Sequence, residues 1–281
     1  MTLEAESIRL ANGVRLPYVE QGDSAGIPLL PVHAIADSWR SFERVLTYLP
    51  RSIHVYALTQ RGHGDADRPA EGYRPRDLAE DLLAFMDALE IEAAVVVGGS
   101  SSGVVVQRLA IEHPERVLGL VLLGSPLTFR DKPRMREFVE STILTLTDPL
   151  DPAFVREFVE SVTARPVPQD FLDTMIEENL KVPARVWQAM FVAMLEDDCA
   201  DELDRIRAPT LIIWGDEDTI VPRKDQEAMA AAIPRARLLV YRGAGHLFYW
   251  EDPKGVADDL SAFVWQISAL EVRSAGDDSG G

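Results

Sequence analysis

The chain contains a single cysteine, Cys199, among its 281 residues. One thiol cannot form a disulfide within the chain, and a cysteine-based metal site needs several. The residues around it, LEDDCADEL at 195–203, are mostly acidic, and their negative potential raises the pKa of the thiol. We therefore expect Cys199 to be unreactive, so that the chemistry of this protein rests on other side chains.

The sequence also lacks long apolar runs. Runs such as 118–123 are far shorter than the roughly 20 residues that a membrane-spanning helix needs. The first residues, MTLEAESIRLANG, carry acids early and contain no apolar segment, which argues against a signal peptide. We expect a cytoplasmic protein.

Positive charge is scarce. Lys and Arg number 28 against 46 Asp and Glu, which gives a formal net charge of −18. Nucleic acids and anionic membranes are bound through patches of Lys and Arg. The charge therefore argues against both kinds of partner. The expected partner is a small-molecule substrate, and a homodimer stays open.

Apolar and amphipathic segments alternate along the chain. Short runs rich in Val, Ile and Leu occur at 28–32, 53–58, 93–97, 118–123, 210–214 and 237–241, and a hairpin at Asn12-Gly13 joins 7–10 to 16–20. Helical patterns separate these runs, at 76–89, 104–113, 224–232 and 254–270. This alternation predicts an α/β fold with a mostly parallel sheet between helices.

One stretch breaks the alternation. Residues 128–205 hold four helical patterns and no strand, which predicts a helical insertion between two sheet strands. We therefore expect a first core part at 1–127 and a second at 206–270. Residues 271–281 are predicted to be a disordered tail, because SAGDDSGG at 274–281 is polar and rich in glycine.

The most informative segment is EAAVVVGGSSSG at 92–103, where a buried strand runs into glycines, three serines and a helix. Acyl transfer needs a hydroxyl on a sharp strand-to-helix turn, and such a turn requires small neighbours. A strict G-x-S-x-G match makes Ser101 the nucleophile. The other register, Gly98-Gly99-Ser100-Ser101-Ser102, makes it Ser100. A phosphate-binding P-loop is excluded because no Lys follows the glycines.

A family resemblance favours Ser100. Residues 89–100 and 113–117 resemble, without a gap, the α/β-hydrolase pattern "LGIERAVVVGHSMGG" followed by "HPERV". Residues 215–222, GDEDTIVP, resemble the family's "WGDxDxxVP", whose second Asp orients a histidine and corresponds to Asp218. Residues 242–246, RGAGH, resemble its "GxGH" loop and place the base at His246. The chain order of nucleophile, acid and histidine is also that of the family.

The resemblance covers about residues 7–270 and implies an α/β-hydrolase fold. That fold has a mostly parallel eight-stranded sheet flanked by helices, with the insertion at 128–205 forming a helical cap. The resemblance also implies an oxyanion hole made by the backbone N–H groups of Ile35 and Ser101. His33 resembles the histidine of the family's "HG" motif, which shapes the oxyanion loop. Together with Trp39 and Phe248 it is a candidate for the wall of a substrate pocket.

The sequence departs from the family pattern near the expected oxyanion hole. Ala34 replaces the glycine that follows His33 in the family, and Ser102 replaces the last glycine of the turn. An alanine forced to positive φ costs about 1 kcal/mol or more. A few of the large apolar residues of the insertion should line a pocket, the candidates being Phe138, Phe154, Phe158, Phe171, Met175, Trp187, Met190, Phe191 and Met194.

The expected function is hydrolysis of an ester, lactone or related acyl bond through an acyl-enzyme, without a cofactor. No histidine pair has metal-ligand spacing, so no metal is expected. Epoxide hydrolases and haloalkane dehalogenases of this fold carry an aspartate where Ser100 stands. Carbon–carbon bond hydrolysis and perhydrolysis use the same three side chains and stay open. A non-catalytic relative that binds a small ligand under the cap also stays open.

Overall fold

The computed structural model describes residues 3–277 and contains one eight-stranded sheet. The strands are β1 (Glu6–Arg9), β2 (Arg15–Gln21), β3 (Ile27–Val32), β4 (Ile53–Leu58), β5 (Ala94–Gly99), β6 (Val117–Leu123), β7 (Thr210–Gly215) and β8 (Ala236–Tyr241). Their order in the sheet is β1-β2-β4-β3-β5-β6-β7-β8. Only the pairs β1·β2 and β2·β4 are antiparallel, so the predicted mostly parallel sheet is confirmed.

The central strands are apolar because both of their faces are covered. Every residue of β4, β5 and β7 is buried, which explains why their sequences do not alternate between apolar and polar residues. β3 lies beside β5, with Leu29 opposite Val95 and Val32 opposite Gly98. The loops that follow β3 and β5 therefore leave the same edge of the sheet side by side.

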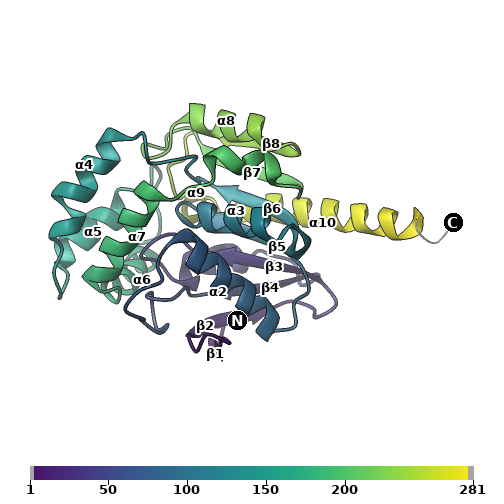
Figure 1. The fold of residues 1–281 in the computed structure, drawn as a ribbon, viewed down its shortest axis with the longest axis horizontal. Helices are drawn as coiled ribbons and strands as arrows, with labels where there is room; N and C mark the ends of the chain where they lie inside the picture. The colour runs from purple at the N-terminus through teal and green to yellow at the C-terminus, as the bar shows by residue number, and fades with distance from the viewer. Residues whose placement is uncertain (1–2, 278–281) are drawn as a thin grey trace.

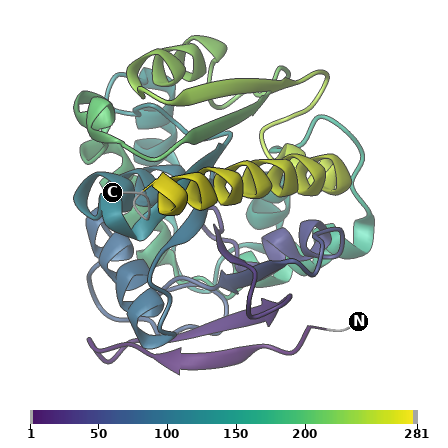
Figure 2. The same cartoon turned by 90° about the vertical axis from the view of Figure 1, so that its right-hand side faces the viewer.

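Helices cover both faces of the sheet. These are α1 (Glu43–Leu46), α2 (Pro75–Ala88), α3 (Ser102–Glu112), α8 (Arg223–Ala232), α9 (Phe248–Glu251) and α10 (Pro253–Asp277). Figure 1 shows α2 and α3 in front of the sheet, and α10 contacts β3 and β6. Figure 2 shows α10 lying across the sheet, with the β1–β2 hairpin at one edge and β8 at the other.

Four α-helices connect β6 to β7: α4 (Pro133–Ser141), α5 (Pro152–Glu160), α6 (Gln169–Leu180) and α7 (Ala184–Glu196). Proline begins α4 and α5 at the first helical position, where its missing N–H has no partner in any helix. Figure 1 shows these helices grouped at the end of the molecule opposite the C-terminus. We refer to α4–α7 as the helical insertion.

The prediction for the C-terminal tail is wrong over residues 271–277. α10 continues through them to Asp277, whereas residues 278–281 lie outside the described part of the chain. Each residue added to an existing helix gains a backbone hydrogen bond without a new nucleation step. The segment EVRSA at 271–275 also contains good helix formers. Within residues 3–277, no helix combines the length and the apolar character needed to cross a membrane.

A buried carboxyl group joins the loop after β3 to the helical insertion. Asp37, only 3% exposed, accepts hydrogen bonds from Ser41 Oγ at 2.8 Å and from Asn179 Nδ2 of α6 at 3.1 Å. Burial raises the pKa of Asp37 to about 7, and the nearby Glu178 acts in the same direction. The two hydrogen bonds oppose this rise only in part. The contact fixes one end of α6 beside the loop that follows β3.

Replacing Asp37 should change how stability depends on pH. A carboxyl whose pKa is raised from 3.8 to about 7 by folding holds a proton in the folded state that the unfolded state has lost. Its contribution is therefore present at low pH and is lost as pH rises through that range. The free energy of unfolding can be measured in urea between about pH 5 and 8 for the wild type and for Asp37→Asn. The value for the wild type minus that for the variant should decrease as the pH rises to about 7.

The exposed Asp23 offers a matched control, because Asp23→Asn measures the effect of an Asp-to-Asn change at the surface over the same range. A pH-independent difference for Asp37→Asn would show that this carboxyl is not protonated in the folded protein.

Candidate active site

Steric crowding shapes the turn that carries Ser100. Ser100 has a φ of +50°, between β5 and α3, which few residues other than glycine adopt. A Cβ atom on Gly98 would lie 2.7 Å from the Gly103 Cα, and one on Gly103 would lie 2.0 Å from Ser125 Oγ. Ser102, by contrast, has room, and its hydroxyl lies 2.7 Å from the carbonyl oxygen of Val32. The tight positions are therefore Gly98 and Gly103, and serine is accommodated at 102.

Ser100, His246 and Asp218 form a continuous hydrogen-bonded chain. Ser100 Oγ lies 2.7 Å from His246 Nε2, and His246 Nδ1 lies 2.7 Å from Asp218 Oδ2. The His246 side chain is 4% exposed and that of Asp218 is fully buried. These three residues come from loops after β5, β8 and β7, whose parallel strands end at one edge of the sheet. The geometry suits removal of the Ser100 proton by the imidazole.

The turn after β7 holds the Asp218 carboxylate in place. Its Oδ1 accepts the backbone N–H groups of Ile220 at 2.7 Å and Val221 at 3.0 Å, which leaves Oδ2 for His246. The other acid of the turn, Asp216, accepts the N–H of Gly243 from the loop after β8. Asp218 therefore orients the imidazole ring of His246, whereas Asp216 holds the backbone of the loop after β8.

The loop that carries His246 is also tied to the helical insertion, which the sequence did not indicate. Glu251 Oε1 accepts the N–H of Gly245 at 3.1 Å and that of Ala164, between α5 and α6, at 2.6 Å. The N–H of Leu247 donates to the carbonyl oxygen of Val162 at 2.9 Å. No local sequence pattern could reveal the bonds to Ala164 and Val162, because the first joins residues 87 positions apart and the second spans a similar distance.

The two expected oxyanion donors lie side by side, but only one is free. Among the described residues, no acceptor lies within hydrogen-bonding distance of the Ser101 N–H. The Ile35 N–H, in contrast, donates to Ser101 Oγ at 2.8 Å. Ala34 does not need positive φ in this loop; the strained residue is Ala36, with a φ of +67°.

His33 braces the loop after β3. It is fully buried, and burial lowers its pKa well below the usual value, with His63 adding to the effect. The neutral ring donates from Nδ1 to the carbonyl oxygen of Ala34 at 2.8 Å and accepts the Gln60 N–H at Nε2, at 2.9 Å. Because both ring nitrogens bond to backbone groups, His33 holds the loop after β3 in place.

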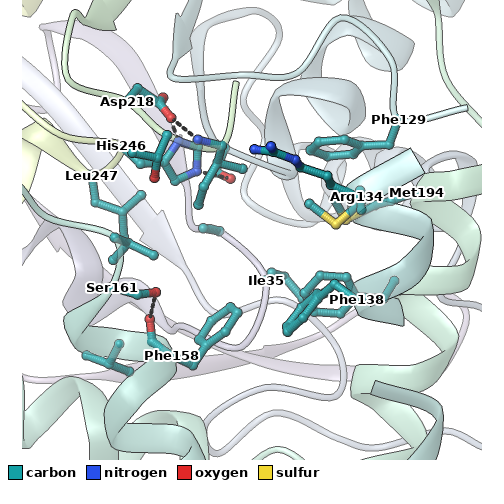
Figure 3. Close-up of a pocket in the computed structure, with 18 of the residues that line it drawn as sticks. Ile35, Phe129, Arg134, Phe138, Phe158, Ser161, Met194, Asp218, His246 and Leu247 are labelled. Atoms are coloured by element: carbon teal, nitrogen blue, oxygen red, sulfur yellow. Dashed lines mark hydrogen bonds and ion pairs between the residues drawn. The ribbon is translucent and has the colours of Figure 1, made fainter. Parts of the chain in front are cut away.

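A cavity of about 960 Å³ opens onto Ser100, His246 and Asp218. Its walls are mostly apolar and come from both the sheet loops and the helical insertion, and they include Ile35, Phe129, Met135, Phe138, Phe154, Phe158, Val159, Phe191, Met194, Leu247 and Trp250. Figure 3 shows Phe138 and Phe158 across the cavity from the His246–Asp218 pair. Two buried polar residues, Asp37 and Asn179, also line it.

The three pocket residues expected from the sequence do not line this cavity. His33 lies behind the loop after β3, as described above. Trp39 begins the 3-10 helix η1 (Trp39–Phe42), and its ring lies beneath the Arg40 guanidinium. Phe248 packs against Tyr241 of β8, with ring centroids 5.2 Å apart. These residues lie next to the loops after β3 and β8 in sequence, but their side chains turn toward the core. The expectation that they line the substrate pocket is therefore wrong.

The apolar candidates of the insertion divide into two groups. Phe138, Phe154, Phe158, Phe191 and Met194 line the cavity. Phe171, Met175, Trp187 and Met190 are buried without reaching it. Trp187, for example, is fully buried and packs against the rings of Phe158 and Phe191.

One cluster of candidate metal ligands occurs among the described residues, formed by Glu80, Glu112 and His113. Arg76 and Arg108 already pair with Glu112, so much of its charge is balanced by protein groups.

Comparisons with known proteins agree with this architecture. A model of the family described as alpha/beta hydrolase fold matches residues 27–253. The chain is 33% identical to a 2-hydroxymuconate semialdehyde hydrolase of Pseudomonas sp. (strain CF600), with 94% of this chain and 95% of that protein covered. It is 28% identical to a non-heme chloroperoxidase of Streptomyces lividans, over 92% of this chain and 99% of that protein.

Among solved structures, an esterase from Exiguobacterium antarcticum superposes with a TM-score of 0.84 at 21% identity, covering 93% of this chain and 99% of that one. At this identity the likeness concerns the fold. Because the family model matches most of the chain and the 33%-identical relative covers nearly all of it, this protein belongs to the alpha/beta hydrolase fold family and is a hydrolase of that fold.

Proposed function

We propose that this protein is a serine hydrolase that cleaves an ester, lactone or related acyl bond of an apolar small molecule through an acyl-enzyme. The observation that carries the proposal is the chain of two 2.7 Å contacts from Ser100 through His246 to Asp218, at the wall of the cavity. A serine hydroxyl is a weak nucleophile by itself, and an adjacent oriented base activates it.

In the proposed reaction, Ser100 Oγ attacks the carbonyl carbon while its proton passes to His246 Nε2. The carbonyl electron pair moves to oxygen, where the free backbone N–H of Ser101 stabilises the negative charge. Asp218 holds the tautomer with the proton on Nδ1 and stabilises the imidazolium. The leaving alcohol then takes the proton from His246, and water hydrolyses the acyl-enzyme with His246 acting again as base.

The walls of the cavity support an apolar substrate. A volume of about 960 Å³ lies at the upper end of what ligand pockets of about 300–1,000 Å³ provide. Aromatic side chains of α4, α5 and α7 line the cavity, among them Phe138, Phe158 and Phe191. Burying apolar area contributes about 25 cal/mol per Å² to binding before the costs of association.

A second candidate is hydrolysis of a carbon–carbon bond in a substrate that carries a carboxylate. The relative named 2-hydroxymuconate semialdehyde hydrolase favours it, and so does Arg134. This residue lines the cavity, and Figure 3 shows its side chain on the same side as Phe129 and Met194. Within the described part of the chain, no carboxylate forms an ion pair with Arg134, so its charge is open to an anionic substrate.

The nucleophile can be identified by covalent labelling. A fluorophosphonate probe should add to Ser100 of the folded protein, because the imidazole activates this hydroxyl and not that of Ser101. Fragmentation mass spectrometry locates the adduct, and Ser100→Ala should remove it. An adduct on Ser101 would move the nucleophile by one residue. No adduct together with no turnover of p-nitrophenyl esters would indicate a protein that only binds its ligand.

Removing the carboxylate behind His246 should slow the chemical step. Asp218→Asn should lower kcat for p-nitrophenyl esters by about 10³–10⁴-fold, because the amide favours the wrong imidazole tautomer. Asp216→Asn is the matched control on the same turn, since Asp216 bonds to the Gly243 N–H and not to the imidazole. Equal losses in both variants would point to the turn as a whole instead of the Asp218–His246 contact.

The two candidate reactions can be separated with Arg134→Ala. If the substrate carries a carboxylate, this change should raise KM for 2-hydroxymuconate semialdehyde by about 10-fold or more, since hydrogen bonds to charged groups contribute about 1.5–3 kcal/mol. KM for neutral p-nitrophenyl esters should change little. Steady-state assays of both substrates with the wild type and the variant test this, and an equal effect on both substrates would count against carboxylate recognition.

A further inference from the structure

The contact between Ile35 and Ser101 distinguishes this site from one built on two free backbone donors. Ile35 follows β3 and Ser101 follows β5, and the two strands are direct neighbours in the sheet. The Ile35 N–H points at Ser101 Oγ, 2.8 Å away, and therefore not at open space above Ser100. A substrate oxyanion would have to compete with this hydroxyl for the Ile35 hydrogen bond.

The Ser101 hydroxyl has a proton to donate. Its oxygen accepts from Ile35, but among residues 3–277 the structure shows no hydrogen bond donated by its own O–H. Ser101 is 5% exposed, so water reaches this group poorly. A buried donor left without an acceptor costs about 1–3 kcal/mol. An anion that forms next to Ser101 would satisfy it.

The free amide of Ser101 lies on the same residue. The N–H and the O–H of Ser101 are thus two unused donors directly after the nucleophile, and neither has a partner within the described chain. A hydroxyl that accepts one hydrogen bond becomes a better donor of another, because chains of hydrogen bonds polarise one another. The Ile35 N–H therefore strengthens the Ser101 hydroxyl as a donor.

We propose that the side-chain hydroxyl of Ser101 is a catalytic oxyanion donor, held and polarised by the Ile35 N–H. The inference rests on the proposed acyl-transfer function. When Ser100 Oγ bonds to the carbonyl carbon, the electron pair of the C=O bond moves to oxygen and the Ser100 proton passes to His246. Ser101 keeps its own proton throughout and only donates a hydrogen bond. The N–H and the O–H of Ser101 then both donate hydrogen bonds to the oxyanion, while the Ile35 N–H donates to the Ser101 hydroxyl.

Ser101→Ala tests this role directly. kcat/KM for p-nitrophenyl esters should fall by about 10–100-fold, somewhat less than the 10²–10³-fold that loss of one oxyanion donor commonly causes, since the variant frees the Ile35 N–H. Ser101→Cys, which keeps the side-chain size but offers a weaker donor, should show a similar loss. Ser101→Thr, which keeps a hydroxyl, should retain most of the activity.

A trifluoromethyl ketone separates this role from a structural one. It adds reversibly to Ser100 and gives an oxyanion, so Ser101→Ala should weaken its binding by the same factor as kcat/KM. Affinity for the matching alcohol, which cannot add to Ser100, should stay unchanged. Ser261→Ala removes another buried serine hydroxyl, on α10, and should leave both affinities unchanged.

The inference is wrong if Ser101→Ala and Ser101→Cys bind the trifluoromethyl ketone as tightly as the wild type. It is also wrong if Ser101→Ala reacts faster, because the hydroxyl would then only block the Ile35 N–H. These outcomes are distinct from failure of the proposed function. In that case the wild type itself would not react with a fluorophosphonate.

Discussion

The left-handed backbone at Ser100 is the constraint on which the site depends. A φ of +50° turns the chain sharply from β5 into α3 and lifts the hydroxyl out of the sheet edge toward His246. The turn is feasible because Gly98 and Gly103 carry no Cβ atom, which would clash with the backbone and side chains that approach them closely. Strain of this kind costs on the order of 1–3 kcal/mol and is typical of functional positions.

The helical insertion completes a site that the sheet alone would leave open. Hydrogen bonds hold it at several places, among them one between Asn179 and Asp37 and one between Glu251 and the segment at Ala164. Glu251 also binds the loop that carries His246, so the position of the insertion and the position of the base are linked. Apolar walls strengthen the electrostatic contacts of the site, because they lower the local dielectric.

Asp37 is the exception in this apolar environment. A carboxyl that lines the cavity and has its pKa raised to about 7 is mostly neutral below that pH. A neutral acid can donate as well as accept a hydrogen bond, and it avoids the cost of a buried charge. The polar pair Asp37–Asn179 is thus compatible with an otherwise apolar substrate cavity.

The sequence by itself indicated the α/β fold, and its resemblance to a known family indicated the three side chains that meet at the sheet edge. Buried runs separated by amphipathic segments fix a parallel sheet, and Ser100, Asp218 and His246 follow strands whose carboxyl ends coincide. Tertiary structure alone decided which neighbours face the cavity. Phe248 adjoins the base in sequence yet packs on the core, and Ile35 finds its partner 66 residues away in Ser101. The physical reason is that local patterns determine which segments form strands and helices, whereas side-chain direction and hydrogen-bond partners depend on contacts between distant segments.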